Sequence, residues 1–290
     1  MEIQASDPAF SSGASGHPHA VPDLAFTMPL KVRSYEVTEA GFVGIGVILR
    51  YLEHLATTAS AARGFDHVWY ERSGTAWVVR EMDLLLGSLP GIDEELTLAT
   101  WLSDFRRVQA HREYAIWRAG DQRLVARARA RWAYVDRVRG QLTRLPDELV
   151  SRFGVAGSPM RRRDLGAPVA RDGEASERVS TLDLTARGYE CDTQRHVNNT
   201  VYADWLTEAL ERSLSQRMGW PEPARACYRY LHIEYVRPVR AGQRVNITTK
   251  VTALGSRGLH SSQTIANTDE QTICVQANMR LLRVGPPTSI

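Results

Sequence analysis

The 290-residue sequence predicts an α+β fold made of two similar bodies, in each of which one long helix packs against a curled antiparallel sheet. Three observations predict this fold. A segment of the chain recurs without a gap, an amphipathic helical pattern continues from both copies, and several extended runs separated by turn residues follow each helix. The chain is long enough for two domains of roughly 130 residues each.

A repeated segment predicts the helix of each body. Residues 35–54 (YEVTEAGFVGIGVILRYLEH) align with residues 189–208 (YECDTQRHVNNTVYADWLTE) at a constant offset of 154. Both copies continue with apolar residues three or four positions apart and end at a glycine, which is typical of an amphipathic helix with a C-terminal glycine cap. The repeat therefore predicts a turn and one long helix in each body.

Extended runs follow each predicted helix. They are rich in β-branched and aromatic residues, and turn signals such as LPGIDE, AGQ and GSRG separate them. A strand, a long helix and then a meander of about four strands form the hot-dog arrangement, in which a curled sheet covers the helix. The predicted meander strands are residues 75–86, 95–103, 110–120 and 123–136 in the first body, and 229–239, 244–254, 259–268 and 272–284 in the second.

Two stretches rich in Ser, Gly, Pro and Ala divide the chain. They predict a disordered tail (1–24), a first hot-dog domain (25–153), a linker (154–177) and a second hot-dog domain (178–290). The tail lacks the basic and apolar regions of a signal peptide. No run of about 18 apolar residues indicates a membrane span.

Composition narrows the class of function. The 36 Lys and Arg exceed the 33 Asp and Glu by only 3, and Lys31 and Lys250 are the only lysines. This small excess does not indicate nucleic acid; it fits an acidic partner, an anionic substrate or simply an arginine-rich proteome. Cys191, Cys227 and Cys274 form no Cys-x-x-Cys pair, so we expect a reducing, cytoplasmic location and neither a zinc nor a redox site.

The two copies of the turn before the helix differ in polarity. The second copy carries a carboxylate, an imidazole and three amides, whereas the first copy is mostly apolar or glycine. A turn that only capped a helix would have similar requirements in both copies, so the difference indicates a single reactive site. The polar residues are Asp192, Gln194, His196, Asn198 and Asn199, and their counterparts are Thr38, Ala40, Phe42, Gly44 and Ile45.

This set of groups suits chemistry at a thioester, which needs a base or nucleophile and donors for the developing oxyanion. Asp192 suits the first role. Backbone N–H groups of residues 197–199, expected to be unpaired at the positive end of the helix dipole, suit the second. Gln194 and His196 are expected to orient a water molecule or the carboxylate. The two asparagines are candidates for substrate binding, although capping of the helix explains them equally well.

The segment RHVNNTVYADWLTEAL resembles the His-Val-Asn-Asn signature of plant and bacterial acyl-ACP thioesterases, which is followed by Tyr and Trp on the helix. In the first body, RSYEV and WVVREMDLLLGSLPGIDEELTLATWLS resemble the N-terminal hot-dog domain of the same family. The resemblance covers residues 25–284. It implies that Asp192 and His196 are catalytic and that the first hot-dog domain holds the acyl chain between its helix and sheet.

The resemblance further implies hydrolysis of fatty acyl-acyl carrier protein without a metal or cofactor, by a monomer or homodimer. Acidic acyl carrier protein is the implied partner, and exposed arginines such as Arg195 and residues 161–163 are candidates for contact with it. Two positions depart from the plant pattern: Gln194 replaces an asparagine, and Pro238 stands where a catalytic-network glutamate is found. Activation of water by Asp192 and direct attack to form an anhydride both stay open.

Three other interpretations remain. An acyl-CoA thioesterase needs the same turn and differs by a nucleotide pocket. A hot-dog hydratase uses the pattern Asp-x-Asn-Pro-x-His, which requires one more residue between Asp192 and His196 and a proline. A non-enzymatic acyl-chain sensor would normally add a DNA-binding helix-turn-helix, for which the segment before Ala25 is short and polar.

Overall fold

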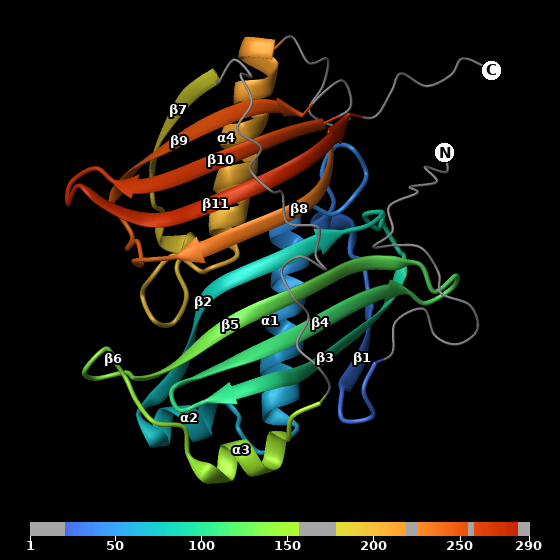
Figure 1. The fold of residues 1–290 in the computed structure, drawn as a ribbon, viewed down its shortest axis with the longest axis vertical. Coiled ribbons are helices and arrows are strands. Elements are labelled where there is room, and N and C mark those ends of the chain that lie inside the picture. Colours follow the sequence, from blue (N-terminus) through green and yellow to red (C-terminus); the bar gives the residue numbers. More distant parts are fainter. Residues whose placement is uncertain (1–20, 157–177, 219–225, 255–257, 284–290) are drawn as a thin grey trace. The chain divides into compact units, whose positions relative to one another are not determined.

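A computed structural model describes residues 21–156, 178–218, 226–254 and 258–283. The chain divides into two compact units, of which the first comprises residues 1–43 and 47–166 and the second comprises residues 44–46 and 167–290. Each unit consists of an antiparallel sheet with one long helix against it (Figure 1). The predicted α+β architecture of two hot-dog domains is therefore confirmed.

The strands of the first unit are β1 (Phe26–Lys31), β2 (Thr75–Leu86), β3 (Glu95–Arg106), β4 (Gln109–Arg118), β5 (Leu124–Asp136) and β6 (Gln141–Leu142). They form an antiparallel sheet in the order β1-β3-β4-β5-β2, and the short β6 pairs with the end of β5. Helix α1 (Ile45–Ala61) lies along one face of this sheet (Figure 1).

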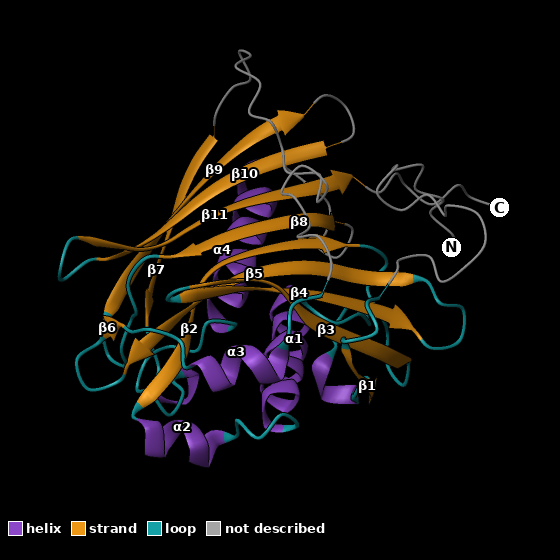
Figure 2. Cartoon of the chain, turned by 60° about the horizontal axis from the view of Figure 1, so that its bottom comes forward, coloured by secondary structure: helices purple, strands orange, loops and turns teal. Residues whose placement is uncertain are grey.

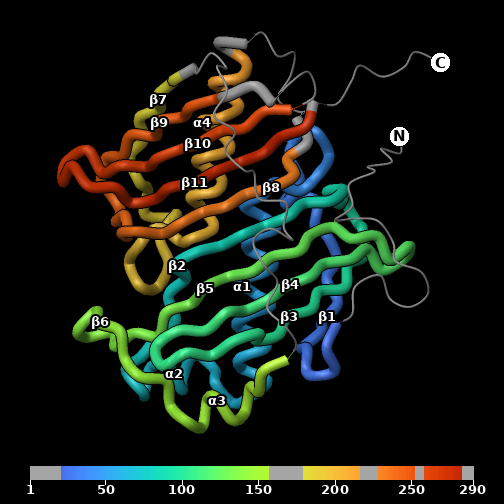
Figure 3. Tube along the Cα trace, viewed as in Figure 1, coloured from blue at the N-terminus to red at the C-terminus, as the bar shows by residue number. Residues whose placement is uncertain are grey.

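The strands of the second unit are β7 (Arg178–Thr185), β8 (Ala226–Tyr235), β9 (Arg244–Leu254), β10 (Gly258–Asn267) and β11 (Thr272–Arg283). Their antiparallel order is β7-β9-β10-β11-β8, and helix α4 (Val201–Met218) lies along one face. This is the order of the first sheet, with β7 in the place of β1 and β8 in the place of β2. Figure 3 traces the two repeats, from blue to green in the first unit and from yellow to red in the second.

Both long helices bury one apolar face. In α1, Ile48, Leu52 and Leu55 are at most 1% exposed, and their spacing of three or four residues places them on the same side of the helix. The buried face of α4 consists of Ala203, Leu206, Leu210 and Leu214, all 0% exposed. Burial of each leucine contributes about 1.5–3 kcal/mol, so these faces hold the helices on their sheets.

Two short helices of the first unit are not among the predicted elements: α2 (His67–Ser73) and α3 (Asp147–Phe153), both visible in Figure 2. Asp66 caps α2, because its side chain accepts a hydrogen bond from the N–H of the third helical residue at 2.8 Å. Phe153 of α3 stacks on Phe65 with ring centroids 5.7 Å apart. Helices of seven residues are too short to show a clear period, so only their caps could have indicated them.

Most of the predicted tail (1–24) and linker (154–177), including residues 161–163, lies outside the described residues. The described ends of both segments contact the first unit. The carbonyl of Leu24 accepts a hydrogen bond from Arg63 Nη2 at 3.1 Å, and Ala156, 7% exposed, donates its N–H to a β3 carbonyl at 2.9 Å. The predicted domain boundaries stay a prediction. No helix in the described ranges is long and apolar enough to cross a membrane.

Candidate active site

A backbone hairpin forms the turn before α4. Cys191 and Val197 pair as an antiparallel bridge. Between them, the N–H of Asp192 donates to the carbonyl of His196 at 2.9 Å, and the N–H of Arg195 donates to the carbonyl of Asp192 at 3.0 Å. Arg195 has a φ of 62°, the left-handed conformation that closes this tight turn. The hairpin therefore places Asp192 and His196 directly across from each other.

The side chains of Asp192 and His196 are both partly exposed, whereas Gln194 is exposed. Asp192 Oδ1 accepts a hydrogen bond from the N–H of Gln194 at 2.8 Å, so the carboxylate also stabilises the turn. Burial lowers the pKa of His196, the guanidinium of Arg240 lowers it further, and the carboxylate of Asp192 opposes both. The net shift is downward, which favours the neutral imidazole at neutral pH.

The amide N–H groups near the start of α4 differ from the expectation. Val197 donates to the carbonyl of Val239 at 2.8 Å, and Asn198 donates to a carbonyl of the preceding 3-10 helix at 2.9 Å. The prediction that all three N–H groups of residues 197–199 are unpaired is therefore wrong, because neighbouring loops accept two of them. In the described part of the chain, the N–H of Asn199 makes no hydrogen bond, so one donor remains for an oxyanion.

The two asparagines have defined local roles. Asn198 Oδ1 accepts hydrogen bonds from the N–H and the hydroxyl of Thr200 at 2.9 and 2.7 Å, which caps the start of α4. The backbone carbonyl of Asn199 accepts a hydrogen bond from the Tyr235 hydroxyl at 3.0 Å. Substrate contact by either side chain stays a prediction.

A buried glutamate fixes the entrance of the turn. Glu190 ends a 3-10 helix, η3 (Gly188–Glu190), and is 9% exposed. Its carboxylate accepts hydrogen bonds from the N–H of Arg187 at 2.7 Å and from Nε1 of Trp205, on α4, at 3.1 Å. The first residues of the turn are therefore tied directly to the helix that follows it.

The first unit has the same backbone scaffold at its equivalent turn. The N–H of Thr38 donates to the carbonyl of Phe42 at 2.9 Å. Glu36 accepts hydrogen bonds from a backbone N–H three residues earlier at 2.8 Å and from the hydroxyl of Tyr51, on α1, at 2.8 Å. The two turns share one shape and differ in the side chains that this shape presents. Phe42, at the position of His196, is 50% exposed.

Sequence reasoning missed Arg240, the exposed residue whose charge acts on His196. It lies in the connection from β8 to β9, which corresponds to the connection from β2 to β3 at an offset of 149. Gly91 is the equivalent residue in the first unit. Alignment of these two connections, in addition to the two turns, would have revealed a second gain of charge in the second unit.

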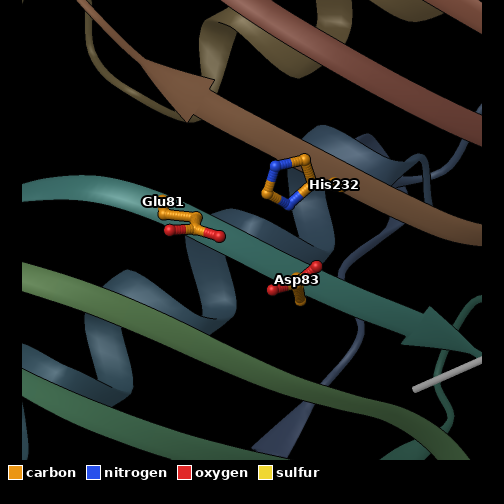
Figure 4. Close-up of side chains that lie close together, drawn as sticks. All are labelled: Glu81, Asp83 and His232. Carbon is orange, nitrogen blue, oxygen red and sulfur yellow. The ribbon is translucent and has the colours of Figure 1, made fainter. Parts of the chain in front are cut away.

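Three titratable side chains outside the turn are drawn in Figure 4. On β2 of the first unit, Glu81 accepts a hydrogen bond from Arg131 Nε at 3.1 Å, and Asp83 is 6% exposed. On β8 of the second unit, His232 is 7% exposed. Each belongs to a strand of its own unit, and we assign none of them to the candidate site.

Two family profiles match the sequence. The family described as "Acyl-ACP thioesterase N-terminal domain" matches residues 23–153, and the "Thioesterase-like superfamily" matches residues 187–285. The first unit therefore matches the acyl-ACP thioesterase family, and the second matches the broader thioesterase-like superfamily. The turn with Asp192 and His196 lies in the second matched range, and its apolar counterpart lies in the first.

Curated members of this family share low identity with the chain. The palmitoyl-acyl carrier protein thioesterase of Arabidopsis thaliana is 22% identical over 203 residues, which are 67% of this chain and 49% of that protein. The oleoyl-acyl carrier protein thioesterase 2 of the same plant is 23% identical over 197 residues, 63% of this chain and 53% of that protein. The chain thus spans about half the length of the curated relatives it matches.

Solved structures of family members share the fold. The 12:0-ACP thioesterase from Umbellularia californica superimposes with a TM-score of 0.73 at 16% identity, covering 90% of this chain and 95% of that one. An acyl-ACP thioesterase from Bacteroides thetaiotaomicron gives a TM-score of 0.67 at 16% identity, covering 89% and 98%. At these identities the likeness supports the tandem hot-dog fold.

Proposed function

We propose that this protein hydrolyses the thioester of a fatty acyl chain carried on acyl carrier protein, releasing a free fatty acid and ending its synthesis. One observation carries the proposal: two turns share a backbone scaffold, and only the second presents a carboxylate and an imidazole across from each other, Asp192 and His196. The match of residues 23–153 to the acyl-ACP thioesterase family supports the choice of substrate.

In the proposed reaction, the thioester carbonyl binds beside the start of α4. The N–H of Asn199 donates to the developing oxyanion, where the positive end of the helix dipole adds to its effect. Asp192 either removes a proton from the attacking water or attacks the carbonyl itself, and Gln194 and neutral His196 orient the water. In the first route, the carrier thiol leaves with the proton that the attacking water gives up. In the second route, the thiolate leaves as the anhydride forms, and water then hydrolyses the anhydride, regenerating Asp192 and supplying the proton for the thiol.

Isotope labelling distinguishes the two roles of Asp192. We would run a single turnover in oxygen-18 water and analyse the peptide that contains Asp192 by mass spectrometry. Attack by the carboxylate forms an anhydride, and attack of water on the aspartyl carbonyl of that anhydride leaves label in the aspartate, so label in Asp192 would exclude direct attack by water on the thioester. Direct attack by water leaves the aspartate unlabelled and places all label in the fatty acid.

The first unit is the proposed site of the acyl chain. The face of α1 that meets the sheet is apolar, with Ile48, Leu52 and Leu55 at most 1% exposed, and an alkyl chain is compatible with such surroundings. The equivalent turn of this unit lacks the reactive pair, since Thr38 and Phe42 stand at the positions of Asp192 and His196. Both features support a division of labour between the two units.

The carrier is the proposed partner, and the reaction is placed in the cytoplasm. Arg195 is exposed at the tip of the turn, where a cation is available to an acidic carrier protein. Cys191 and Cys274 are free thiols, which is compatible with a reducing compartment.

Release of free thiol from a panel of acyl chains tests the proposal. Saturated chains of graded length would each be offered on acyl carrier protein and on coenzyme A, with Asp192→Asn as the matched inactive control. Faster turnover on the carrier protein, lost in the control, supports the proposal and gives the preferred length. Faster turnover on coenzyme A would favour an acyl-CoA thioesterase, and no release from either carrier would contradict hydrolysis.

A further inference from the structure

We propose that Arg240 is a positioning residue of this site: the backbone places it across from His196, where its charge adds to burial in favouring the neutral imidazole, which can accept a hydrogen bond from the attacking water. The inference rests on the proposed function for its chemical meaning. Its structural basis is separate and lies in the contact between the turn before α4 and the connection from β8 to β9.

One backbone hydrogen bond sets the register of this contact. The N–H of Val197 donates to the carbonyl of Val239 at 2.8 Å. In an antiparallel pair, such a bond places the residue before the donor, His196, across from the residue after the acceptor, Arg240. Opposed residues of an antiparallel pair project to the same side. The side chains of His196 and Arg240 therefore share one side of the contact.

The first unit shows the same register without the charges. There the N–H of Val43 donates to the carbonyl of Pro90 at 3.0 Å, and Phe42 and Gly91 pair as an antiparallel bridge. Phe42 and Gly91 occupy the positions of His196 and Arg240. The unit whose turn has Phe42 thus has a glycine at this place, and the unit whose turn has an imidazole has an arginine.

Val239 is held from both sides, which limits the movement of its neighbour Arg240. Its carbonyl accepts from the turn, as described above, and its N–H donates to the hydroxyl of Tyr202, a residue of α4 that is 3% exposed, at 2.9 Å. The tyrosine ring packs edge-on against Trp205, with centroids 5.4 Å apart. The β8–β9 connection is therefore fixed to the helix that carries the turn.

Two charged groups act on His196, and they oppose each other. Asp192, across the hairpin, favours the imidazolium, whereas Arg240, from the β8–β9 connection, disfavours it, as does partial burial. An imidazolium would pair with Asp192 and lower the basicity of the carboxylate. It would also have no nitrogen lone pair left to accept a hydrogen bond from water. By disfavouring the imidazolium, Arg240 keeps this lone pair available.

Histidine titration by NMR tests the inference without any turnover. The imidazole signal of His196 would be followed against pH in the wild type, Arg240→Gln, Arg240→Lys and Arg237→Gln. The last variant is the matched control, because Arg237 is an exposed arginine of the same connection, three residues before Arg240 and outside the pair of positions across from each other. We expect the apparent pKa of His196 to rise by about half a unit to one unit in Arg240→Gln, as for two charges a few ångströms apart near water.

The other two variants and the pH dependence of turnover also have defined expected results. Arg240→Lys should stay near the wild type, and Arg237→Gln should match it. In turnover assays, the acidic limb of the kcat/KM profile should move to higher pH by the same amount in Arg240→Gln alone. An unchanged pKa of His196 in Arg240→Gln, or an equal rise in Arg237→Gln, would overturn the inference. If the wild type releases no thiol, the proposed function fails, and the NMR comparison alone decides the role of Arg240.

Discussion

The carboxylate of Glu190 holds the entrance of the candidate site, and its replacement by glutamine is the most informative single perturbation. Glu190→Gln preserves the size of the side chain but removes its charge and one of its two acceptor oxygens. In the native chain, these oxygens accept from the N–H of Arg187 at 2.7 Å and from the indole of Trp205 at 3.1 Å. We expect the variant to lose both stability and activity.

The magnitude follows from the burial of this contact. Glu190 is 9% exposed, and the new amide NH₂ would face one of the two donors, so one buried hydrogen bond to a charged acceptor is lost at a cost of about 1.5–3 kcal/mol. The pairing with the Arg187 guanidinium, at 3.4 Å, adds little because that side chain is 57% exposed. For a chain of this size, we expect a melting temperature lower by roughly 4–10 °C.

The chain contains its own control, Glu36→Gln. Glu36 accepts equivalent hydrogen bonds in the first unit, from the N–H of Arg33 and the hydroxyl of Tyr51, both at 2.8 Å. Calorimetry should show destabilisation in both variants, whereas thiol release at a temperature where both are folded should fall much further in Glu190→Gln. Equal loss of activity in the two variants, or an unchanged melting temperature in Glu190→Gln, would refute the reasoning.

Three further predictions concern charge. Asp192→Asn should lower kcat by about 10² to 10⁴ at an unchanged melting temperature, because the amide oxygen can still accept the N–H within the turn; near-native turnover would contradict this. Arg195→Gln should raise KM for an acyl carrier substrate at low salt and flatten its salt dependence, and a salt response equal to that of the wild type would count against it. Burial alone raises the pKa of Glu36, but hydrogen bonds from Arg33 and Tyr51 lower it overall. Its stabilisation is therefore full above the unfolded pKa of about 4.3 and is lost as pH falls through the lower folded value. Thermal melts of the wild type and Glu36→Gln should converge toward acid pH.

Much of the fold could be predicted because the sequence contains two copies of each helix and strand pattern. The runs predicted as 75–86 and 244–254 are β2 and β9 with the same bounds, and the other predicted meander strands begin within three residues of their predicted starts. The apolar spacing in 48–55 predicted the buried face of α1. Periodicity over ten or more residues carries this information, and two copies of each pattern reinforce it.

The parts that escaped prediction depend on contacts distant in sequence. The N–H of Val197 was expected to be unpaired, but its acceptor is the carbonyl of Val239, which no local pattern indicates. For the same reason Arg240 was overlooked, since only the fold brings it to His196. The polar set from Asp192 to Asn199 was found because the first copy of the turn provided a reference within the same chain.

Comparison of the matching turns of the two units shows which groups define the loop conformation and which groups provide the reactive side chains. Backbone hydrogen bonds and the Glu36 and Glu190 carboxylates define the same loop in both units, yet Thr38 and Phe42 stand where Asp192 and His196 stand. The loop conformation therefore does not require the reactive side chains. A protein with this organisation can change, lose or regain chemistry at one turn without redesigning its architecture. The turn of the first unit is accordingly a scaffold on which a second reactive pair could be engineered.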